Sequence, residues 1–193
     1  MENTSSKSVD ISTLKEFQIQ NYKDASKKAL VTPLREKLGL IEKDFENIKD
    51  ICNQPLVYEF IFNEKLIGKP YSIEKAHDFL TWSEKGWSES THFPFVIRDE
   101  EKRIIGAIDI KSNNPVNAEV GYWIDGGITG FMTNALIGLV SMAKEAGYKS
   151  LTALARQDNY RSKGVLVRAG FKNVGQEEDK KTGRIRDKFE LQF

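Results

Sequence analysis

The stretch EVGYWIDGGITGFMT, Glu119–Thr133, contains a strand-like segment, a glycine-rich loop and the start of a helix-like segment in direct succession. Residues 118–124 are rich in β-branched and aromatic side chains, which favours a strand. Apolar residues over 131–143 recur at helical spacing. A helix that begins directly after such a loop offers unpaired backbone N–H groups and the positive end of its dipole, which favours binding of a phosphate or diphosphate. The alternative is that Gly126 and Gly127 only form a tight turn.

The segments on both sides predict an α+β fold with a mostly antiparallel sheet. Upstream, the periodicity predicts strands over 30–34, 93–97 and 104–110, and helices over 41–52 and 72–86. Downstream, it predicts a buried strand over 151–155, a helix over 159–170 and a closing hairpin that turns at Gly183. No repeat of the solenoid type is present.

The composition predicts one globular domain. The chain has 193 residues, of which 39% are hydrophobic and 30% charged, and this is enough to bury one core. Residues 1–27 are polar, and we expect them to form a loosely attached extension. The domain itself is expected over residues 28–193.

Several classes of function are disfavoured. The net charge of +1 gives no reason to expect nucleic acid as a partner. A run of about 18 apolar residues and a secretory leader are both missing, which predicts a cytoplasmic protein that does not enter a membrane. The single Cys52 excludes an internal disulfide, and one cysteine with two histidines does not suggest a metal site. The Gly-Lys-Ser/Thr pattern of nucleotide hydrolases is absent too.

A second motif, RQDNYRSKGVLVRAGF, occupies Arg156–Phe171. Together with the glycine loop it resembles the GCN5-related N-acetyltransferase (GNAT) family, in particular the branch of ribosomal-protein N-terminal acetyltransferases. The combination of motifs is specific, although no single piece is, and it spans roughly residues 28–193. The matching positions are Gly121, Tyr122, Trp123, Ile124, Gly130, Asn159, Ser162, Gly170 and Phe171.

The resemblance implies a twisted sheet of about seven strands with about four flanking helices. It also implies a V-shaped split between the fourth and fifth strands, residues 118–124 and 151–155, in which acetyl-coenzyme A (acetyl-CoA) would lie. The backbone of Trp123 and Ile124 would pair with the pantetheine arm. Asn159 would bind the pantetheine, and Ser162 would lie near the thioester sulfur. The implied diphosphate ligands are the loop residues Thr129, Gly130, Phe131, Met132 and Thr133.

The loop departs from the family pattern at two positions. Gly127 stands where the family has Gln or Arg, and Met132 stands where the family has Gly or Ala. Without that cation, the helix dipole and Arg161 or Lys163 are left to meet the phosphate charge. The alternative function is therefore a non-catalytic acyl-CoA-binding or interaction module with a degenerate loop.

Such a fold implies acetyl transfer from acetyl-CoA to a primary amine, by direct attack in a ternary complex. The acceptor is a protein N-terminus or a small-molecule amine. An amine attacks only when it is unprotonated, so a base is expected. Glu119, as a partly buried carboxylate with a raised pKa, is the first candidate, and Asp109 is the second. Ser162 is the candidate proton donor to the departing thiolate, with Tyr160 as a further option.

The acceptor cleft is expected to involve Tyr58, Phe60, Trp87 and Asp109, with a further contribution from Glu64. Cys52 is expected in the core because direct transfer needs no acyl-cysteine. The sequence leaves open whether the protein is a monomer or a homodimer.

Overall fold

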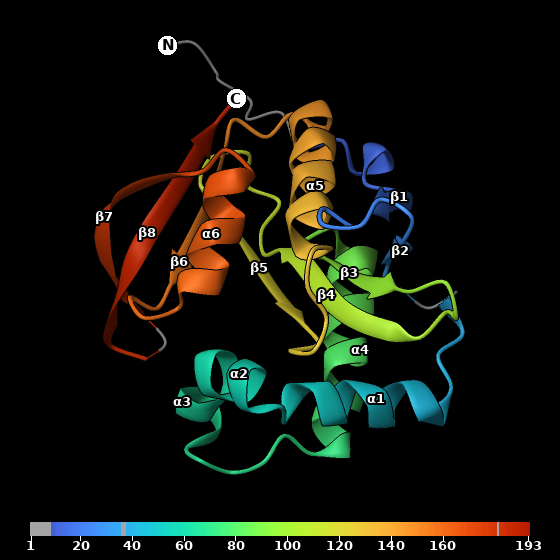
Figure 1. The fold of residues 1–193 in the computed structure, drawn as a ribbon. Coiled ribbons are helices and arrows are strands. Elements are labelled where there is room, and N and C mark those ends of the chain that lie inside the picture. Colours follow the sequence, from blue (N-terminus) through green and yellow to red (C-terminus); the bar gives the residue numbers. More distant parts are fainter. Residues whose placement is uncertain (1–8, 36–37, 181) are drawn as a thin grey trace, which may run out of the picture.

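Segments rich in β-branched and aromatic residues form an open sheet of eight strands (Figure 1). The computed structural model describes residues 9–35, 38–180 and 182–193. The strands are β1 (Phe17–Gln20), β2 (Lys28–Pro33), β3 (Phe93–Arg98), β4 (Ile104–Ile110), β5 (Ala118–Ile124), β6 (Ser150–Ala155), β7 (Lys172–Asp179) and β8 (Arg184–Gln192). Their order in the sheet is β1-β2-β3-β4-β5-β6-β8-β7. Neighbouring strands are antiparallel, except β5 and β6, which are parallel.

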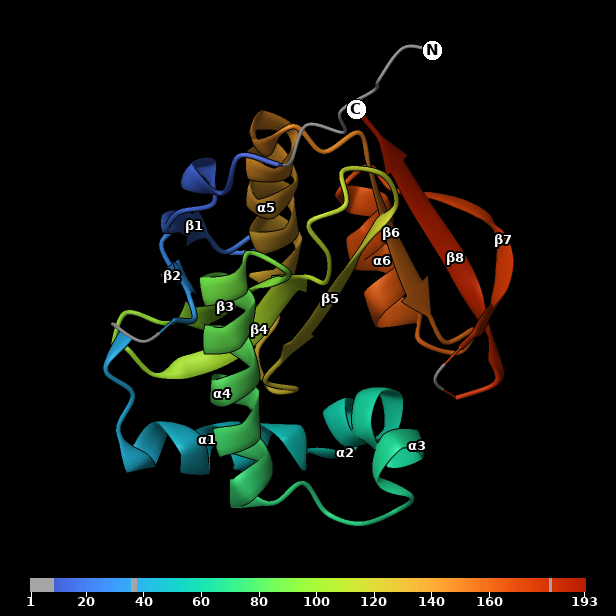
Figure 2. The same cartoon turned by 180° about the vertical axis from the view of Figure 1, so that it is seen from behind.

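Helices cover both faces of the sheet (Figures 1 and 2). One face carries α5 (Met132–Ala146) and α6 (Tyr160–Arg168), and the other carries α1 (Glu42–Cys52) and α4 (Ile73–Glu89). Between α1 and α4 the chain forms α2 (Pro55–Val57), the π-helical turn η3 (Tyr58–Phe62) and α3 (Asn63–Leu66), and a 3-10 turn, η1 (Ile11–Thr13), precedes β1. α5 and α6 contribute to one hydrophobic cluster and α1 to the other, while α4 contributes to both through Trp87 and Ala76.

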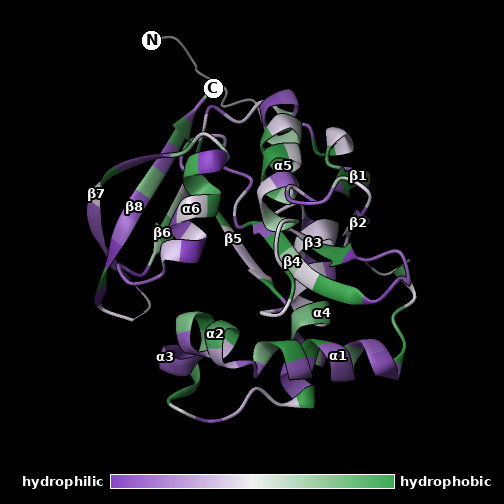
Figure 3. Ribbon diagram, in the orientation of Figure 1, coloured by the Kyte–Doolittle hydropathy of each residue, from purple (hydrophilic) through white to green (hydrophobic). Residues whose placement is uncertain are grey.

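Hydropathy follows this layering. Figure 3 shows that β3 and β4 are mostly hydrophobic, whereas β7 and β8 are more hydrophilic. The first five residues of β3 are buried, because helices cover that part of the sheet on both faces. Every residue of β7, at the sheet edge, is at least partly exposed.

The parallel strands β5 and β6 separate soon after they meet. In the part of the chain that the structure describes, they pair at just two positions, Ala118 with Leu151 and Glu119 with Thr152. Beyond Glu119, β5 stays paired with β4 as far as Ile124, while β6 stays paired with β8. The split that the sequence predicts between residues 118–124 and 151–155 is thereby confirmed, as is the mixed α/β fold.

Residues 9–27 differ from the loosely attached extension that the sequence predicts. β1 pairs with β2 from Phe17 to Gln20 and gives the sheet one strand more than the expected seven. Leu14 is 1% exposed and belongs to the main core. The ring of Phe17 lies against Gly138 of α5, where an added Cβ would come within 2.2 Å of it. The segment is too short and polar for a periodic pattern, so its contacts with distant residues decide its structure. Residues 1–8 lie outside the described residues.

Residues 55–66 are helical, in a stretch between the predicted helices over 41–52 and 72–86 to which the sequence pattern assigns neither helix nor strand. Pro55 begins α2 at a position that tolerates its missing N–H. The turns α2, η3 and α3 have 3, 5 and 4 residues. Helices this short show no periodicity that separates them from a loop.

Leu14→Ala should lower the free energy of unfolding by about 2–4 kcal/mol, because it removes buried methyl groups and leaves a cavity. Urea unfolding followed by circular dichroism measures this loss. Leu30→Ala is the matched control. Because Leu30 is 36% exposed, this substitution should lower the free energy of unfolding by about 1 kcal/mol or less. Equal losses in the two variants would contradict a packed N-terminal segment.

Candidate functional site

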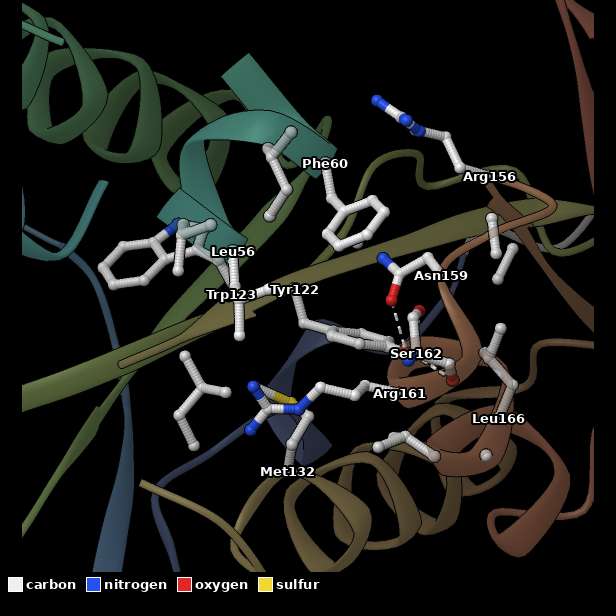
Figure 4. Close-up of a pocket in the computed structure, with 18 of the residues that line it drawn as sticks. Leu56, Phe60, Tyr122, Trp123, Met132, Arg156, Asn159, Arg161, Ser162 and Leu166 are labelled. Atoms are coloured by element: carbon white, nitrogen blue, oxygen red, sulfur yellow. Dashed lines mark hydrogen bonds between the residues drawn. The ribbon is translucent and has the colours of Figure 1, made fainter. Parts of the chain in front are cut away.

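A cavity of about 520 Å³ occupies the split between β5 and β6 (Figure 4). It is lined by β5, the start of α5, α6 and, from the other helical layer, α2 and η3. The sequence-predicted site residues that line it are Phe60, Glu119, Trp123, Ile124, Thr129, Gly130, Met132, Thr133, Asn159 and Ser162. The structure therefore brings together residues from both motifs and from the segment that follows α1.

The diverging part of β5 presents backbone groups to this split. Asp125 N–H donates to Ile105 O (2.8 Å), so the odd-numbered residues of β5 bond to β4. The even-numbered residues, Tyr122 and Ile124, turn their N–H and C=O groups the other way, toward β6. The resemblance to the GNAT family implies this role for Trp123 and Ile124. That is wrong for Trp123, because its backbone groups face β4.

The first three amides of the glycine loop are used within the protein. Gly126 N–H donates to Gln54 Oε1 (2.6 Å). Gly127 N–H donates to Asp125 Oδ1 (2.9 Å) and Ile128 N–H to Asp125 O (2.9 Å). Gln54 Nε2 also donates to Asp125 Oδ1 (3.2 Å). These bonds fix the first half of the loop and tie it to the junction of α1 and α2.

The next five amides are free of such bonds. The backbone N–H groups of residues 129–133 have no hydrogen-bond partner among the described residues. They precede or begin α5, and the cap residue Phe131 makes no side-chain capping bond. The side chain of Phe131 packs in the core, whereas Met132 lines the cavity (Figure 4). Such a row of N–H groups at a helix start has the geometry and charge to bind an anion.

Positive charge is also present at this end of the cavity. The cationic side chains that line it and form no ion pair with any described residue are Lys23, Arg161 and Arg168. Arg168 Nε donates to Thr133 Oγ1 (3.2 Å), which places it beside the start of α5. The sequence analysis offers Lys163 as an alternative to Arg161, but Lys163 is paired with Asp187 (3.0 Å) and does not line the cavity.

The start of α6 brings polar side chains against β5. Asn159 Oδ1 caps the helix by accepting from Ser162 N–H (3.1 Å), while Asn159 Nδ2 has no partner within the described residues (Figure 4). The Ser162 hydroxyl lies 2.9 Å from Tyr122 Oη. Burial raises the pKa of Tyr122 to about 12, so this phenol is protonated at neutral pH. Tyr160 also lines the cavity, and it is 76% exposed.

A cluster of charged residues lies where β5 and β6 begin to separate. Glu119 lines the cavity and forms an ion pair with Lys111. Gly121 leaves room for two side chains, since an added Cβ would lie 2.8 Å from Asp109 Oδ1 and 3.0 Å from Lys111 Nζ. Asp109 Oδ1 is buried and without a partner in the described structure. Burial raises the pKa of Asp109, and the charge of Lys111 partly opposes this. The sequence predicts a partly buried carboxylate with a raised pKa at Glu119. Glu119 is partly buried, whereas the carboxylate whose pKa burial raises is that of Asp109.

Three of the residues predicted for the acceptor cleft do not line the cavity, and Asp109 is one of them. The Tyr58 hydroxyl donates to Lys69 O (2.5 Å) within the α2–α4 segment. Trp87 is 7% exposed, and its Nε1–H donates to Pro94 O (2.9 Å). Trp87 is therefore a core residue, because its face of α4 packs on β3.

Phe60 does line the cavity, at a rim where ion pairs join η3 and α3 to β6 and β8. Arg156 lies 5.0 Å from the Phe60 ring centroid and pairs with Glu59 (2.8 Å). Glu64 pairs with Arg186 and also lines the cavity. Phe60 and Glu64 are predicted from the sequence, but the two arginines are not predicted as their partners, because Arg156, directly after β6, and Arg186, in β8, are far away along the chain.

Comparison with known proteins gives the family. No curated protein sequence matches the chain. A sequence model described as "Acetyltransferase (GNAT) domain" matches residues 38–172. The chain belongs to the GNAT acetyltransferase family. The resemblance carried by the two motifs is thus confirmed.

Solved structures of GNAT acetyltransferases share this fold at low sequence identity. RimJ of Mycobacterium smegmatis, in complex with CoA-disulfide, has a TM-score of 0.69 and 16% identity over 92% of this chain and 86% of RimJ. Ribosomal-protein-S5-alanine acetyltransferase of Vibrio fischeri has a TM-score of 0.63 and 18% sequence identity, over 92% of this chain and 96% of its own chain. The microcin C7 self-immunity acetyltransferase MccE, in complex with acetyl-CoA and AMP, has a TM-score of 0.65 and 18% sequence identity. The match covers 84% of this chain and 92% of MccE.

Neither a membrane-spanning helix nor a metal site is found among the described residues. In residues 9–35, 38–180 and 182–193, no helix is both long and apolar enough to cross a membrane. The same residues contain no group of three His, Cys, Asp or Glu side chains arranged to hold a metal ion. Cys52 is buried, and burial raises the pKa of its thiol, so it is not a thiolate at neutral pH.

Asp109→Asn should increase stability more at neutral than at acidic pH. The folded-state pKa of Asp109 lies above the ordinary value of 3.8, so wild-type stability is highest below that value and falls as the pH rises through the folded-state pKa. Asparagine carries no charge to bury. Urea unfolding from about pH 4 to about pH 7 should therefore show a growing advantage of the variant.

The control for this series is Asp50→Asn, because the Asp50 side chain is 73% exposed. An advantage of Asp109→Asn that shrinks or stays constant as the pH rises would show that Asp109 is not destabilised by its burial.

Proposed function

We propose that this GNAT protein transfers the acetyl group of acetyl-CoA to a primary amine by direct attack in a ternary complex. The observation that carries the proposal is the row of unpartnered N–H groups over residues 129–133, next to the unpaired edge of β5. Family membership supports acetyl transfer. The structures of RimJ and MccE, which contain CoA-disulfide and acetyl-CoA, support coenzyme A as the carrier.

The donor would be held mainly by the backbone. The N–H and C=O groups of Tyr122 and Ile124 would pair with the amides of the pantetheine arm, as an added strand does. Asn159 Nδ2 would donate to a pantetheine carbonyl. The amides of residues 129–133 would meet the diphosphate, with charge support from the cations named above. The family cation that Gly127 lacks would thus be replaced from other elements.

Glu119 would take the proton from the attacking amine. An ammonium must lose a proton before its nitrogen lone pair can attack the thioester carbonyl. Glu119 lines the cavity at the point where the strands separate, and Lys111 holds its carboxylate in place. Asp109 lies behind Gly121 and does not line the cavity. We therefore assign Asp109 to the support of Lys111 and not to direct contact with the acceptor.

The departing thiolate of coenzyme A also needs a proton. In our proposal the Ser162 hydroxyl donates it to the sulfur and regains a proton from Tyr122, whose hydroxyl lies 2.9 Å away. Tyr122 lines the cavity and would take up a proton from solvent once coenzyme A has left. Tyr122 is protonated at neutral pH, as a tyrosine with the ordinary pKa of 10 already is, and burial raises its pKa further, to about 12. The oxyanion of the tetrahedral intermediate would accept a hydrogen bond from a backbone N–H of β5.

The acceptor would approach from the side of α2 and η3, where Phe60 and Glu64 line the cavity. The ribosomal-protein acetyltransferase of Vibrio fischeri, which shares the fold, supports a protein N-terminus as acceptor. A small-molecule amine is the second class to be tested, because the cavity of about 520 Å³ has the size of a small-molecule site.

Acetyl-CoA should bind the protein and raise its melting temperature, because a ligand of the folded state alone stabilises it. Calorimetry and thermal unfolding measure both effects. Arg161→Ala and Arg168→Ala should each weaken binding by about fivefold, roughly 1 kcal/mol for exposed charges. Lys163→Ala is the matched control, a cation on the same helix that does not line the cavity. A lack of stabilisation at millimolar acetyl-CoA would contradict the proposal.

Glu119→Gln should lower turnover by about 10²–10⁴-fold, the usual contribution of a general base, and leave the Kd of acetyl-CoA within about twofold. Release of free thiol, measured against a panel of peptides with free N-termini and of small amines, gives the rate. An unchanged rate would remove Glu119 from the mechanism. If the wild-type protein binds acetyl-CoA but acetylates none of these amines, the acyl-CoA-binding module becomes the better description.

A further inference from the structure

The turn between β1 and β2 holds the loop that precedes α5. Asn21 Nδ2 donates to Thr129 O (2.7 Å), and Tyr22 N–H donates to Gly130 O (2.7 Å). Asn21 is 7% exposed, so its carboxamide is a buried polar group satisfied by this loop. Two successive carbonyl groups of the loop are therefore fixed by one turn of the N-terminal segment.

Gly130 is shaped to receive the Asn21 side chain. Its φ is 95°, in the left-handed region that favours glycine, and an added Cβ would lie 2.1 Å from Asn21 Oδ1. The same Oδ1 accepts from Lys23 N–H (2.8 Å) and Asp24 N–H (3.2 Å). These two bonds fix which way the carboxamide faces and leave Nδ2 for Thr129.

The orientation of the carbonyl groups decides the orientation of the amides. A trans peptide unit is planar, and its C=O and N–H groups point in opposite directions. The bond from Asn21 to Thr129 O therefore turns Gly130 N–H away from the β1–β2 turn. The bond from Tyr22 to Gly130 O does the same for Phe131 N–H. Both amides belong to the unpartnered row over residues 129–133.

We propose that Asn21 is a positioning residue for the diphosphate site. It holds the Thr129–Gly130 peptide so that an N–H group, and not a carbonyl oxygen, is presented to the anion. Rotation of this peptide would replace a donor by a partial negative charge and repel a phosphate. The inference rests on the proposed binding of coenzyme A and adds to it a residue that does not itself touch the ligand.

Two variants of Asn21 separate its possible roles. Asn21→Ala removes all of the carboxamide bonds. Asn21→Ser keeps a short hydroxyl acceptor for the turn amides of Lys23 and Asp24 but does not reach Thr129. Asn134→Ala is the matched control, because Asn134 Nδ2 donates to Gln20 O (2.7 Å) and so joins α5 to β1 without holding the loop.

The test uses coenzyme A as probe, with calorimetry for its Kd and phosphorus NMR for its bound diphosphate. Both Asn21 variants should raise the Kd about tenfold, about 1.4 kcal/mol. At saturating coenzyme A, the diphosphate resonances should shift toward their free positions. Asn134→Ala should keep the wild-type resonances. Its Kd should stay within about twofold of the wild-type value, a difference of about 0.4 kcal/mol.

Several outcomes would overturn the inference. Wild-type binding in Asn21→Ser would show that only the turn matters, and a Kd raised equally by Asn134→Ala would show a general effect of docking the N-terminal segment. Diphosphate resonances that are unchanged in both Asn21 variants would also contradict the positioning role of Asn21. If the wild-type protein does not bind coenzyme A, the proposed function itself fails. If wild type binds and the Asn21 variants bind equally well, only the positioning role fails. Should Asn21→Ala not fold, Asn21→Ser alone decides.

Discussion

The separation of β5 from β6 beyond Glu119 is the constraint on which the site depends. Buried backbone N–H and C=O groups need partners, and an interrupted ladder leaves those of Tyr122 and Ile124 without a strand to bond. The sheet tolerates this because β4 on one side and β8 on the other keep both diverging strands paired along their lengths. A ligand with amide groups of its own can complete the interrupted ladder.

The loop before α5 is held at both ends by distant parts of the chain. Gln54, between α1 and α2, bonds to Gly126 and Asp125, and the β1–β2 turn bonds to Thr129 and Gly130. The free amides follow this second attachment and lead into α5. Since the holding bonds come from elements that also belong to the two helical layers and the sheet, the geometry of the anion site is set by the whole fold and not by the glycines alone.

The sequence predicts well what depends on local pattern. The strand, loop and helix over 118–146 carry strong periodicity, and the two motifs are enough to identify the family. The short strand β1 was not predictable in this way, because its form is set by contacts with distant residues. The helical turns over 55–66 were missed because helices of 3 to 5 residues carry no periodic pattern. The split itself followed from the resemblance, while its exact backbone donors required the register that the β4–β5 ladder fixes.

The same distinction applies to the site residues. Asn159, Ser162 and the loop residues are located by motif, whereas alternation along one strand does not tell which carboxylate is enclosed. Asp109 is enclosed because Gly121, its partner on β5, has no side chain to fill the space. Trp87 shows the converse, since an aromatic residue near a polar stretch packs inward when its helix face meets β3. The roles of Glu119 and Ser162 stay predictions.

The outer strand β7 bears on how the protein behaves at high concentration. An uncovered sheet edge is a template on which another polypeptide can hydrogen-bond and start an aggregate. β7 carries charged side chains at both of its ends, at Lys172 and over residues 177–179, and contains a bulge between Asn173 and Gly175. Charge and the bulge both oppose the addition of a strand from another molecule to β7. The protein can therefore keep the edge of β5 open inside its cleft without an equally receptive edge at β7.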